Sequence, residues 1–325
     1  MDFLFADMLG KPLWMWFVFF VIVLALLALD LGVLHKKNEE IGVKESFLLS
    51  AFYISLGVAF GGWIWFQSGA QAGLEYLTGF VIEKSLAMDN IFVIAMIFGY
   101  FSIPRQYQHR VLLYGILGVV ILRGIMIGAG AAVVENYHWV LYLFAAFLIF
   151  TGIRMLMSTD HGYDVAGNPL LKFLRKRLPI SDSLHGEKFL VKLPDTTTGK
   201  MKTFVTPLLL ALIMVELADL VFAVDSIPAI FAITTDPYIV YTSNIFAILG
   251  LRALYFALAA LIHRFAYLKY ALSLVLIFIG SKIFIADMLG LAKIPPLLSL
   301  AITFTILAGG IVGSLWATRN VEQKS

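Results

Sequence analysis

Five acidic residues of this sequence lie inside segments that are otherwise strongly apolar. Two of them, Glu83 and Asp89, belong to the stretch EKSLAMDNIFV, and Glu216, Asp219 and Asp225 belong to ELADLVFAVDSIPAI. A charged side chain at the centre of a bilayer costs about 3 kcal/mol or more, and such residues usually mark ion pathways, proton relays or ion pairs. We therefore expect the chemistry of the protein in these two stretches.

The oxygen-bearing side chains around these acids favour a hard cation. Carboxylates, the amide of Asn90, the hydroxyl of Ser226 and freed backbone carbonyls are oxygen ligands, which suit Mg²⁺, Ca²⁺ or Mn²⁺. Asn244 is also polar at depth, and it is interpreted either as a bond between helices or as an extra ligand. The sequence has no cysteine and no HxxxH pair of histidines, which argues against a soft-metal site and against a typical zinc site.

Basic residues also lie inside the apolar segments, namely Lys84, Arg123, Arg252 and Lys282. If each paired with one acid, one carboxylate would still need a proton or a bound cation. Ion pairing between helices is the favoured interpretation for Arg123 and Arg252, and it remains an alternative for the acids as a set. Lys84 follows Glu83 directly, and it is interpreted either as a local ion pair or as a proton-coupling group.

The segments that must position these residues are predicted to be membrane-spanning helices. The chain has 325 residues, of which 61% are hydrophobic, and its mean hydropathy of +0.91 lies far above that of soluble domains. Because a span needs about 20 apolar residues, we expect an all-α polytopic membrane protein with about nine transmembrane helices. The nine segments are Leu13–Leu34, Ser46–Phe66, Glu75–Phe101, Val111–Val134, Trp139–Met157, Phe204–Thr234, Tyr238–Ile262, Tyr267–Ile285 and Pro296–Thr318.

The positive charges in the connections predict the orientation. With nine alternating spans, every Lys and Arg outside the spans falls on one side of the membrane, except Lys11 and Lys293. Because basic connections are retained in the cytoplasm, this side is predicted to be cytoplasmic. The N-terminus is then outside and the C-terminus inside.

The connection Ser158–Thr203 is polar and basic. Two short alternating runs in it, KFLVKL and KMKTFV, flank PDTTTG and predict a β-hairpin. The preceding run LLKFLRKRL is basic and amphipathic, and it either lies on the anionic inner leaflet or forms a solvated connector.

The two halves of the chain resemble each other. AMDNIFVI matches AVDSIPAI, VVILRGI loosely matches AILGLRAL, and LIFTGIRM matches LIFIGSKI, in the same order and at similar spacing. The matches place Asp89 on Asp225, Arg123 near Arg252, Gly152 on Gly280 and Arg154 on Lys282.

Three spans per repeat would invert the second copy with respect to the first. Inverted repeats are typical of transporters whose substrate site lies near the membrane midplane. The predicted units are residues 1–74 with two helices, 75–157 with the first repeat, 158–203 with the basic insertion, 204–288 with the second repeat, and 289–325 with the last helix and the tail.

Pro228 follows Asp225 by three residues. Proline lacks a backbone N–H and disfavours helix at the residue before it, so we expect the sixth span to unwind near Asp225. The unwinding would turn this carboxylate toward the other acids and free carbonyls as ligands. Broken helices at membrane depth are tolerated only where they line a cavity or are buried in protein.

The stretches EKSLAMDNIFV and ELADLVFAVDSIPAIFAIT resemble the TerC family of bacterial integral membrane proteins, most closely its Alx branch. LALDLGVLHKK, SNIFAILGLRALYF and LIFIGSKIF extend the resemblance over residues 20–318. The chain has Ala87 and Met88 where the family often has Val or Ser, and Ala218 where many members have Thr; neither difference removes a carboxylate. The resemblance implies manganese export across the inner membrane, with metal ligands at Glu83, Asp89, Glu216, Asp219 and Asp225.

We therefore expect a transporter that exports Mn²⁺ by alternating access. Asn90, Ser226 and Asn244 are its secondary ligands, and Ca²⁺ or another divalent cation remains an alternative cargo. Proton antiport, with Lys84, Arg123 and Arg252 as coupling or ion-pairing residues, is a further hypothesis.

Three other functions stay open at this stage. They are a membrane assembly or metallation factor that contacts the secretion machinery through the insertion, a component of tellurium resistance, and a passive channel. The sequence has no phosphate-binding loop, GxSxG or HExxH, so we expect no enzyme, and its net charge of +3 suggests no nucleic-acid partner. A homo-oligomer remains open.

Overall fold

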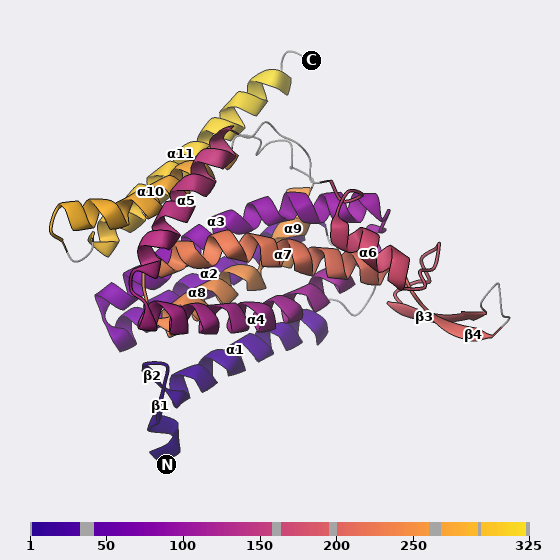
Figure 1. The fold of residues 1–325 in the computed structure, drawn as a ribbon, viewed down its shortest axis with the longest axis horizontal. Helices are drawn as coiled ribbons and strands as arrows, with labels where there is room; N and C mark the ends of the chain where they lie inside the picture. Colours follow the sequence, from indigo (N-terminus) through magenta and orange to yellow (C-terminus); the bar gives the residue numbers. More distant parts are fainter. Residues whose placement is uncertain are drawn as a thin grey trace.

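The computed structural model describes residues 2–32, 42–157, 164–194, 200–259, 268–291 and 294–322. Long helices form a bundle, and a short helix with a β-hairpin projects from one end of it (Figure 1). In chain order the helices are α1 (Leu13–Gly32), α2 (Val43–Ser68), α3 (Ala70–Tyr100), α4 (Arg105–Asn136), α5 (Val140–Met157), α6 (Pro169–Arg177), α7 (Pro207–Phe231), α8 (Pro237–Leu249), α9 (Leu251–Ala259), α10 (Leu268–Met288) and α11 (Pro296–Glu322). The strands are β1 (Asp7–Met8), β2 (Lys11–Pro12), β3 (Leu190–Pro194) and β4 (Met201–Val205), and a short 3₁₀ helix, Asp2–Phe5, precedes them.

Seven of the described helices are long and apolar enough to cross a membrane, and the bent pair α8–α9 adds an eighth candidate span. The seven are α1, α2, α4, α5, α7, α10 and α11. The predicted count of nine depends on α3, which has 31 residues but carries Glu75, Glu83, Lys84 and Asp89. The structure therefore establishes a mainly helical, multi-pass protein with seven or eight apolar spans, and the ninth stays a prediction.

The outward-facing sides of these helices are apolar. Phe66 of α2, Ile125 of α4 and Trp316 of α11 expose 89%, 65% and 70% of their surface. Exposed apolar surface on this scale is typical of contact with a membrane. The polar side chains described below point inward instead.

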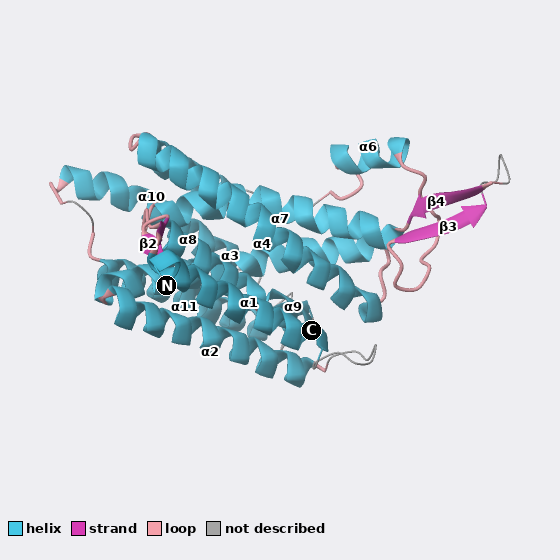
Figure 2. Cartoon of the chain, turned by 90° about the horizontal axis from the view of Figure 1, so that it is seen from below, coloured by secondary structure: helices cyan, strands magenta, loops and turns pink. Residues whose placement is uncertain are grey.

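Helix α8 lies at the centre of the bundle. Every residue from Tyr238 to Leu249 is buried, and the helix packs against α1, α2, α3 and α4. Aromatic rings surround it, with the ring of Phe60 tilted at 4.5 Å from that of Phe246 and Trp16 edge-on at 4.9 Å from Tyr238. Figure 2 shows α1 and α2 along the outer side of this core. Because α8 has no lipid-facing side, its polar residues are available to the protein interior alone.

The seventh predicted span, Tyr238–Ile262, is broken at Gly250, where α8 and α9 meet at 41°. Lys84 of α3 donates a hydrogen bond of 2.9 Å from Nζ to the carbonyl of Ala247, in the last turn of α8. A cation at a helix C-terminus satisfies an orphan carbonyl and interacts favourably with the helix dipole. A Cβ at position 250 would lie 2.8 Å from the Cβ of Tyr53, so a glycine is needed at the break.

The expected unwinding at Pro228 is wrong. Helix α7 runs unbroken from Pro207 to Phe231 and contains Pro228. The proline lies in the last turn, so it removes one backbone hydrogen bond close to where the ladder ends anyway. Asp225 is therefore carried by regular helix, and the one carbonyl that loses its helical donor to the proline is that of Val224.

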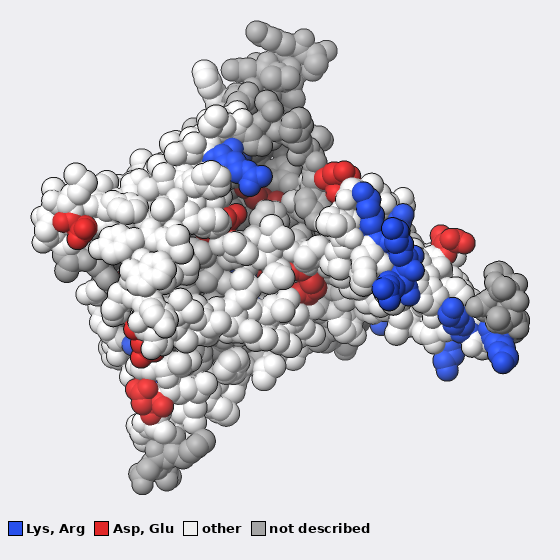
Figure 3. All heavy atoms as spheres, viewed as in Figure 1, with Lys and Arg blue, Asp and Glu red and all other residues white. Residues whose placement is uncertain are grey.

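The insertion between α5 and α7 is attached to the end of the bundle. Strands β3 and β4 form the antiparallel hairpin that the sequence predicts, with Leu190 opposite Val205. Helix α6 buries Leu171 against the core cluster that contains Leu208. Arg110 of α4 forms a 2.8 Å ion pair with Glu187. The apolar side of α6 is thus occupied by protein, and its basic side chains face outward (Figure 3).

Helices α5 and α10 pack along each other, and with α11 they form an arm set at an angle to the other long helices (Figure 1). A Cβ at Gly152 would lie 2.8 Å from the backbone oxygen of Ser273, and one at Gly280 would meet the backbone oxygen of Ala145. Small residues allow this close approach of two membrane helices. Gly152 and Gly280 are the two glycines that the repeat alignment places on each other.

Candidate functional site

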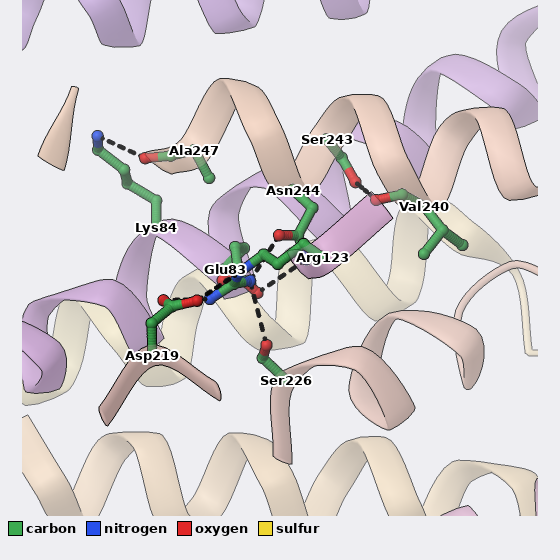
Figure 4. Close-up of polar contacts among 9 residues, drawn as sticks. All are labelled: Glu83, Lys84, Arg123, Asp219, Ser226, Val240, Ser243, Asn244 and Ala247. Carbon is green, nitrogen blue, oxygen red and sulfur yellow. Dashed lines mark hydrogen bonds and ion pairs between the residues drawn. The ribbon is translucent and has the colours of Figure 1, made fainter. Parts of the chain in front are cut away.

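Arg123 of α4 is the centre of a buried polar network, and 1% of it is exposed. It pairs with Glu83 of α3 and with both oxygens of Asp219 of α7, at 2.9 Å from Nη2 to Oδ1 and 3.2 Å from Nε to Oδ2. Nη1 also donates to Oδ1 of Asn244 and, at 3.4 Å, to Oγ of Ser226. Figure 4 shows these side chains converging on Arg123. One cation thus holds oxygen atoms of α3, α7 and α8 together.

Glu83 and Asp219 hold matched positions in the sequence alignment of the two predicted repeats. Each lies six residues before one of the aligned aspartates, Asp89 and Asp225. The repeat alignment could have shown this equivalence, but it was not recognised from the sequence. Asn244 also donates a hydrogen bond to Oε2 of Glu83 at 3.3 Å, so it belongs to the same network. The sequence allows two interpretations of Asn244, a hydrogen bond between helices or an extra ligand.

A cavity of about 310 Å³ lies beside this network. Asp89 and Asp225 line it together with Thr151, whose hydroxyl donates to Oδ1 of Asp225 at 3.3 Å. Figure 3 shows acidic side chains at the bottom of a hollow on this side of the molecule. The remaining lining residues are Glu83, Leu86, Asn90, Arg123, Arg154, Met155, Phe222, Ser226 and Leu276. Thr151 and Arg154 were not predicted as site residues; Arg154 was found only as the match of Lys282.

Glu216 lies apart from the cavity. It precedes Asp219 by one helical turn, and its carboxylate faces Gly115 and Gly118 of α4. Both carboxylate oxygens are shielded from solvent and have no hydrogen-bond partner within the described part of the chain. A Cβ at Gly118 would clash with this carboxylate, so the glycine makes room for it.

Asn90 separates the 310 Å³ cavity from a smaller void. This void of about 20 Å³ is lined by Asn90, Gly115 and Asp219 among others, and it is large enough for one water molecule. Oδ1 of Asn90 is buried and lacks a protein partner in the described structure. A water molecule in the void would supply one.

The five predicted carboxylate ligands therefore occupy three environments. Glu83 and Asp219 hold Arg123, Asp89 and Asp225 line the cavity, and Glu216 faces the glycines of α4. Within the described residues, no three Asp, Glu or His side chains gather closely enough to hold one metal ion.

The other two predicted coupling residues lie outside the cavity. Lys84 bonds the carbonyl of Ala247, and Arg252 of α9 forms a buried ion pair with Asp30 of α1. The sequence alignment places Arg252 near Arg123, but the partner of Arg252 comes from a helix outside both predicted repeats.

A second cavity, of about 580 Å³, lies at the end of the bundle opposite to the insertion. The start of α3 and the end of α10 contribute Glu75, Lys282 and Asp287 to its lining, and His138 precedes α5. Glu75 is held by Gln71, whose amide donates to it at 3.0 Å. None of these residues was predicted as part of a site.

Apolar helices around a charged network and a polar cavity define a multi-pass integral membrane protein with a hydrophilic interior. Residues 68–322 match the family described as "Integral membrane protein TerC family", and the chain belongs to this family.

Relatives match nearly the full chain. A membrane protein of Rickettsia bellii, named only as uncharacterized, is 49% identical over 95% of this chain and 99% of its own. A protein of Salmonella typhi with the name "Putative membrane-bound redox modulator Alx" is 42% identical over 97% of this chain and 98% of its own. No solved structure matches this chain.

Proposed function

We propose that the protein exports Mn²⁺ across the bacterial inner membrane, with the 310 Å³ cavity as its binding site. The observation that carries this proposal is that Asp89 and Asp225, the aligned aspartates of two different helices, line one internal cavity with Asn90 and Ser226. Carboxylate, amide and hydroxyl oxygens are ligands that Mn²⁺ accepts, and two carboxylates balance its charge. Ca²⁺ and other divalent cations share this ligand chemistry.

The name of the Alx relatives suggests a redox role for those proteins. The present chain has no cysteine, so it has no thiol with which to exchange disulfides. Its buried polar groups are oxygen ligands and cations, which supports ion transport over thiol chemistry.

A sequence of carboxylates along the bundle supports a transport path. Glu216 is nearest to the insertion end of α7, and Asp219 follows it by one turn, with Glu83 of α3 bound to the same arginine. The 580 Å³ cavity with Glu75 and Asp287 lies at the other end. With the basic insertion in the cytoplasm, this order leads from the cytoplasm outward.

Alternating access is supported by the pairing of matched positions. Gly152 of α5 lies against Ser273 of α10, and Gly280 of α10 lies against Ala145 of α5, so these two contacts are reciprocal. Glu83 and Asp219 both bind Arg123. Such pairings are expected if two inverted repeats are related by a pseudo-two-fold axis. Rocking of one repeat against the other would then open the cavity to each side in turn.

Proton antiport is the coupling we propose. Protonation of two carboxylates removes the charge balance of a divalent ion and releases it, so protons and Mn²⁺ compete for the same groups. Reconstituted liposomes with a pH-sensitive dye inside test this coupling. Mn²⁺ flux without proton counterflow would refute the coupling and leave the binding site intact.

Inside-out membrane vesicles test the export itself. Wild-type protein should accumulate Mn²⁺, and Asp225→Asn should lower the initial rate by about tenfold or more, because it removes one of two charges that balance the cation. Glu135→Gln, an exposed acid at the end of α4, is the matched control and should keep the wild-type rate. Ca²⁺ and Fe²⁺ in parallel vesicles define selectivity, and wild-type rates equal to those of empty vesicles for Mn²⁺ would refute the proposal.

A membrane assembly factor is the second candidate. It is favoured by the exposed basic side chains on α6 and the hairpin, which form a basic surface at one end of the molecule. Replacing these residues by Gln should abolish function in cells if docking is the role, while Asp225→Asn should have no effect. If the protein is a transporter, replacing the basic residues should leave function in cells intact, and Asp225→Asn should abolish it. The basic residues are Lys172, Arg175, Lys176, Arg177, Lys188, Lys192 and Lys202.

A further inference from the structure

We propose that Arg123 is a built-in cation that occupies the carboxylates Glu83 and Asp219 in the metal-free protein and yields them to a divalent ion. It would thereby make the site selective for divalent over monovalent cations. This inference rests on the proposed function, since it assumes the same cargo. It adds Glu83 and Asp219 as a second position for the ion, next to the position between Asp89 and Asp225.

The contacts of Arg123 are those of a ligand set. Its guanidinium bonds five oxygen atoms: both of Asp219, one of Glu83, the amide oxygen of Asn244 and the hydroxyl of Ser226. These atoms come from α3, α7 and α8, and each is a type of oxygen that binds hard divalent ions. An arginine that only joined its own helix to one neighbour would need a single carboxylate, whereas Arg123 binds two carboxylates and two further oxygen atoms.

The charges around Arg123 do not balance. Glu83 and Asp219 carry two negative charges, and Arg123 supplies one positive charge. A divalent cation in its place would neutralise both carboxylates, whereas Na⁺ or K⁺ would only repeat the charge that Arg123 already provides. A divalent ion is therefore favoured to replace Arg123 between Glu83 and Asp219, and a monovalent ion is not.

The displaced guanidinium has a second place to go. Arg123 also lines the 310 Å³ cavity, whose other charged residues are Glu83, Asp89, Asp225 and one further cation, Arg154. When the ion passes from Asp89 and Asp225 to Glu83 and Asp219, a rotation of the long side chain into the cavity would place Arg123 beside the pair that the ion has left. Return of Arg123 to its first position would then help to expel the cation, so binding and release become a competition for one pair of carboxylates.

The repeat counterpart of Arg123 provides the contrast. Arg252 is also buried, but it forms its ion pair with one carboxylate, that of Asp30, and it is not among the residues that line the cavity. Neutralising this pair with Asp30→Asn/Arg252→Gln leaves no unpaired charge and is the matched control.

Mn²⁺ binding to the purified full-length protein in nanodiscs tests the inference, with free Mn²⁺ measured by electron paramagnetic resonance. If Arg123 occupies the carboxylates about nine-tenths of the time, Arg123→Gln should lower the apparent Kd for Mn²⁺ by about tenfold, which corresponds to about 1.4 kcal/mol. Added NaCl should compete with Mn²⁺ in this variant and hardly in the wild type. Transport of Mn²⁺ into vesicles should be slower in Arg123→Gln, because no guanidinium then competes with the bound ion and helps to release it.

An unchanged or higher Kd in folded Arg123→Gln would overturn the inference and leave a structural ion pair. Asp30→Asn/Arg252→Gln should keep the wild-type Kd and salt response; the same gain of affinity in this control would also refute it. If Arg123→Gln does not fold, Arg123→Lys keeps the charge but cannot bridge both carboxylates, and it should bind Mn²⁺ more tightly than the wild type. Wild-type protein that neither binds nor transports Mn²⁺ would refute the proposed function instead.

Discussion

At the scale of single residues, the structure separates charges that look alike in the sequence. Arg123 and Arg252 are both buried arginines, yet Arg123 joins two carboxylates at the cavity and Arg252 joins one at the edge of the bundle. Removing one partner of a buried ion pair costs more than removing both, because the remaining charge is left without compensation. The contribution of such an ion pair can therefore be measured as a change in the free energy of unfolding.

Arg252→Gln alone should lower the free energy of unfolding by about 3 kcal/mol, and Asp30→Asn/Arg252→Gln should recover most of that loss. Thermal unfolding in one detergent measures both variants and the single variant Asp30→Asn, which completes a double-mutant cycle. If the double variant loses as much free energy of unfolding as the two single variants together, the ion pair is not the source of the effect.

At the scale of elements, the contacts between helices decide which positions of the repeats meet. The helices α5 and α10 approach each other at Gly152 and Gly280, and the backbone oxygens of Ser273 and Ala145 lie where side chains would otherwise be. Helix α7 stays regular despite Pro228, so the break in the membrane interior is at Gly250, one span later. Lys84 supports that break by its bond to the carbonyl of Ala247.

Gly280→Ala should destabilise the protein by about 1–3 kcal/mol, because its methyl group meets backbone and the two helices must move apart. Gly309→Ala on α11 is the control, since no atom lies within 4 Å of the added Cβ. Unfolding in detergent compares the two. If alternating access uses this contact as a pivot, Gly280→Ala should also slow Mn²⁺ uptake, and equal stability of the two variants would contradict the close approach.

At the scale of the whole molecule, the two ends of the bundle differ in charge. The exposed basic residues of α6 and the hairpin mark one end, and the hairpin β1–β2 with the 3.1 Å ion pair of Lys11 and Asp236 marks the other. The orientation inferred from these charges remains to be measured. The chain is suited to this measurement because it has no cysteine.

Single cysteines at exposed positions should report the side of each end. We expect Asp182→Cys in the insertion to react with a membrane-impermeant maleimide only in inside-out vesicles, and Met8→Cys only in intact spheroplasts. The cysteine-free wild type gives the background. Labelling of both positions from the same side would contradict an odd number of spans between them and the predicted topology.

The sequence by itself determined which residue types are present and how they are spaced along each element. Long apolar runs must be helices in a membrane because every backbone polar group needs an internal partner. The alternating runs at 188–193 and 200–205 predicted a hairpin, and in the structure residues 190–194 pair with residues 201–205. The acidic motifs predicted where the polar interior lies, and they carried the resemblance to the family that the comparisons establish.

Only the tertiary structure decided which charges meet. Arg123 is 96 residues from Asp219 and 40 from Glu83, so their pairing depends on the rotation and tilt of three helices against one another. Periodicity fixes a direction within one helix and says nothing about the direction of its neighbour. For the same reason, the sequence grouped Glu216 with Asp225, although packing places Glu216 against the glycines of α4 and Asp225 in the cavity beside Thr151.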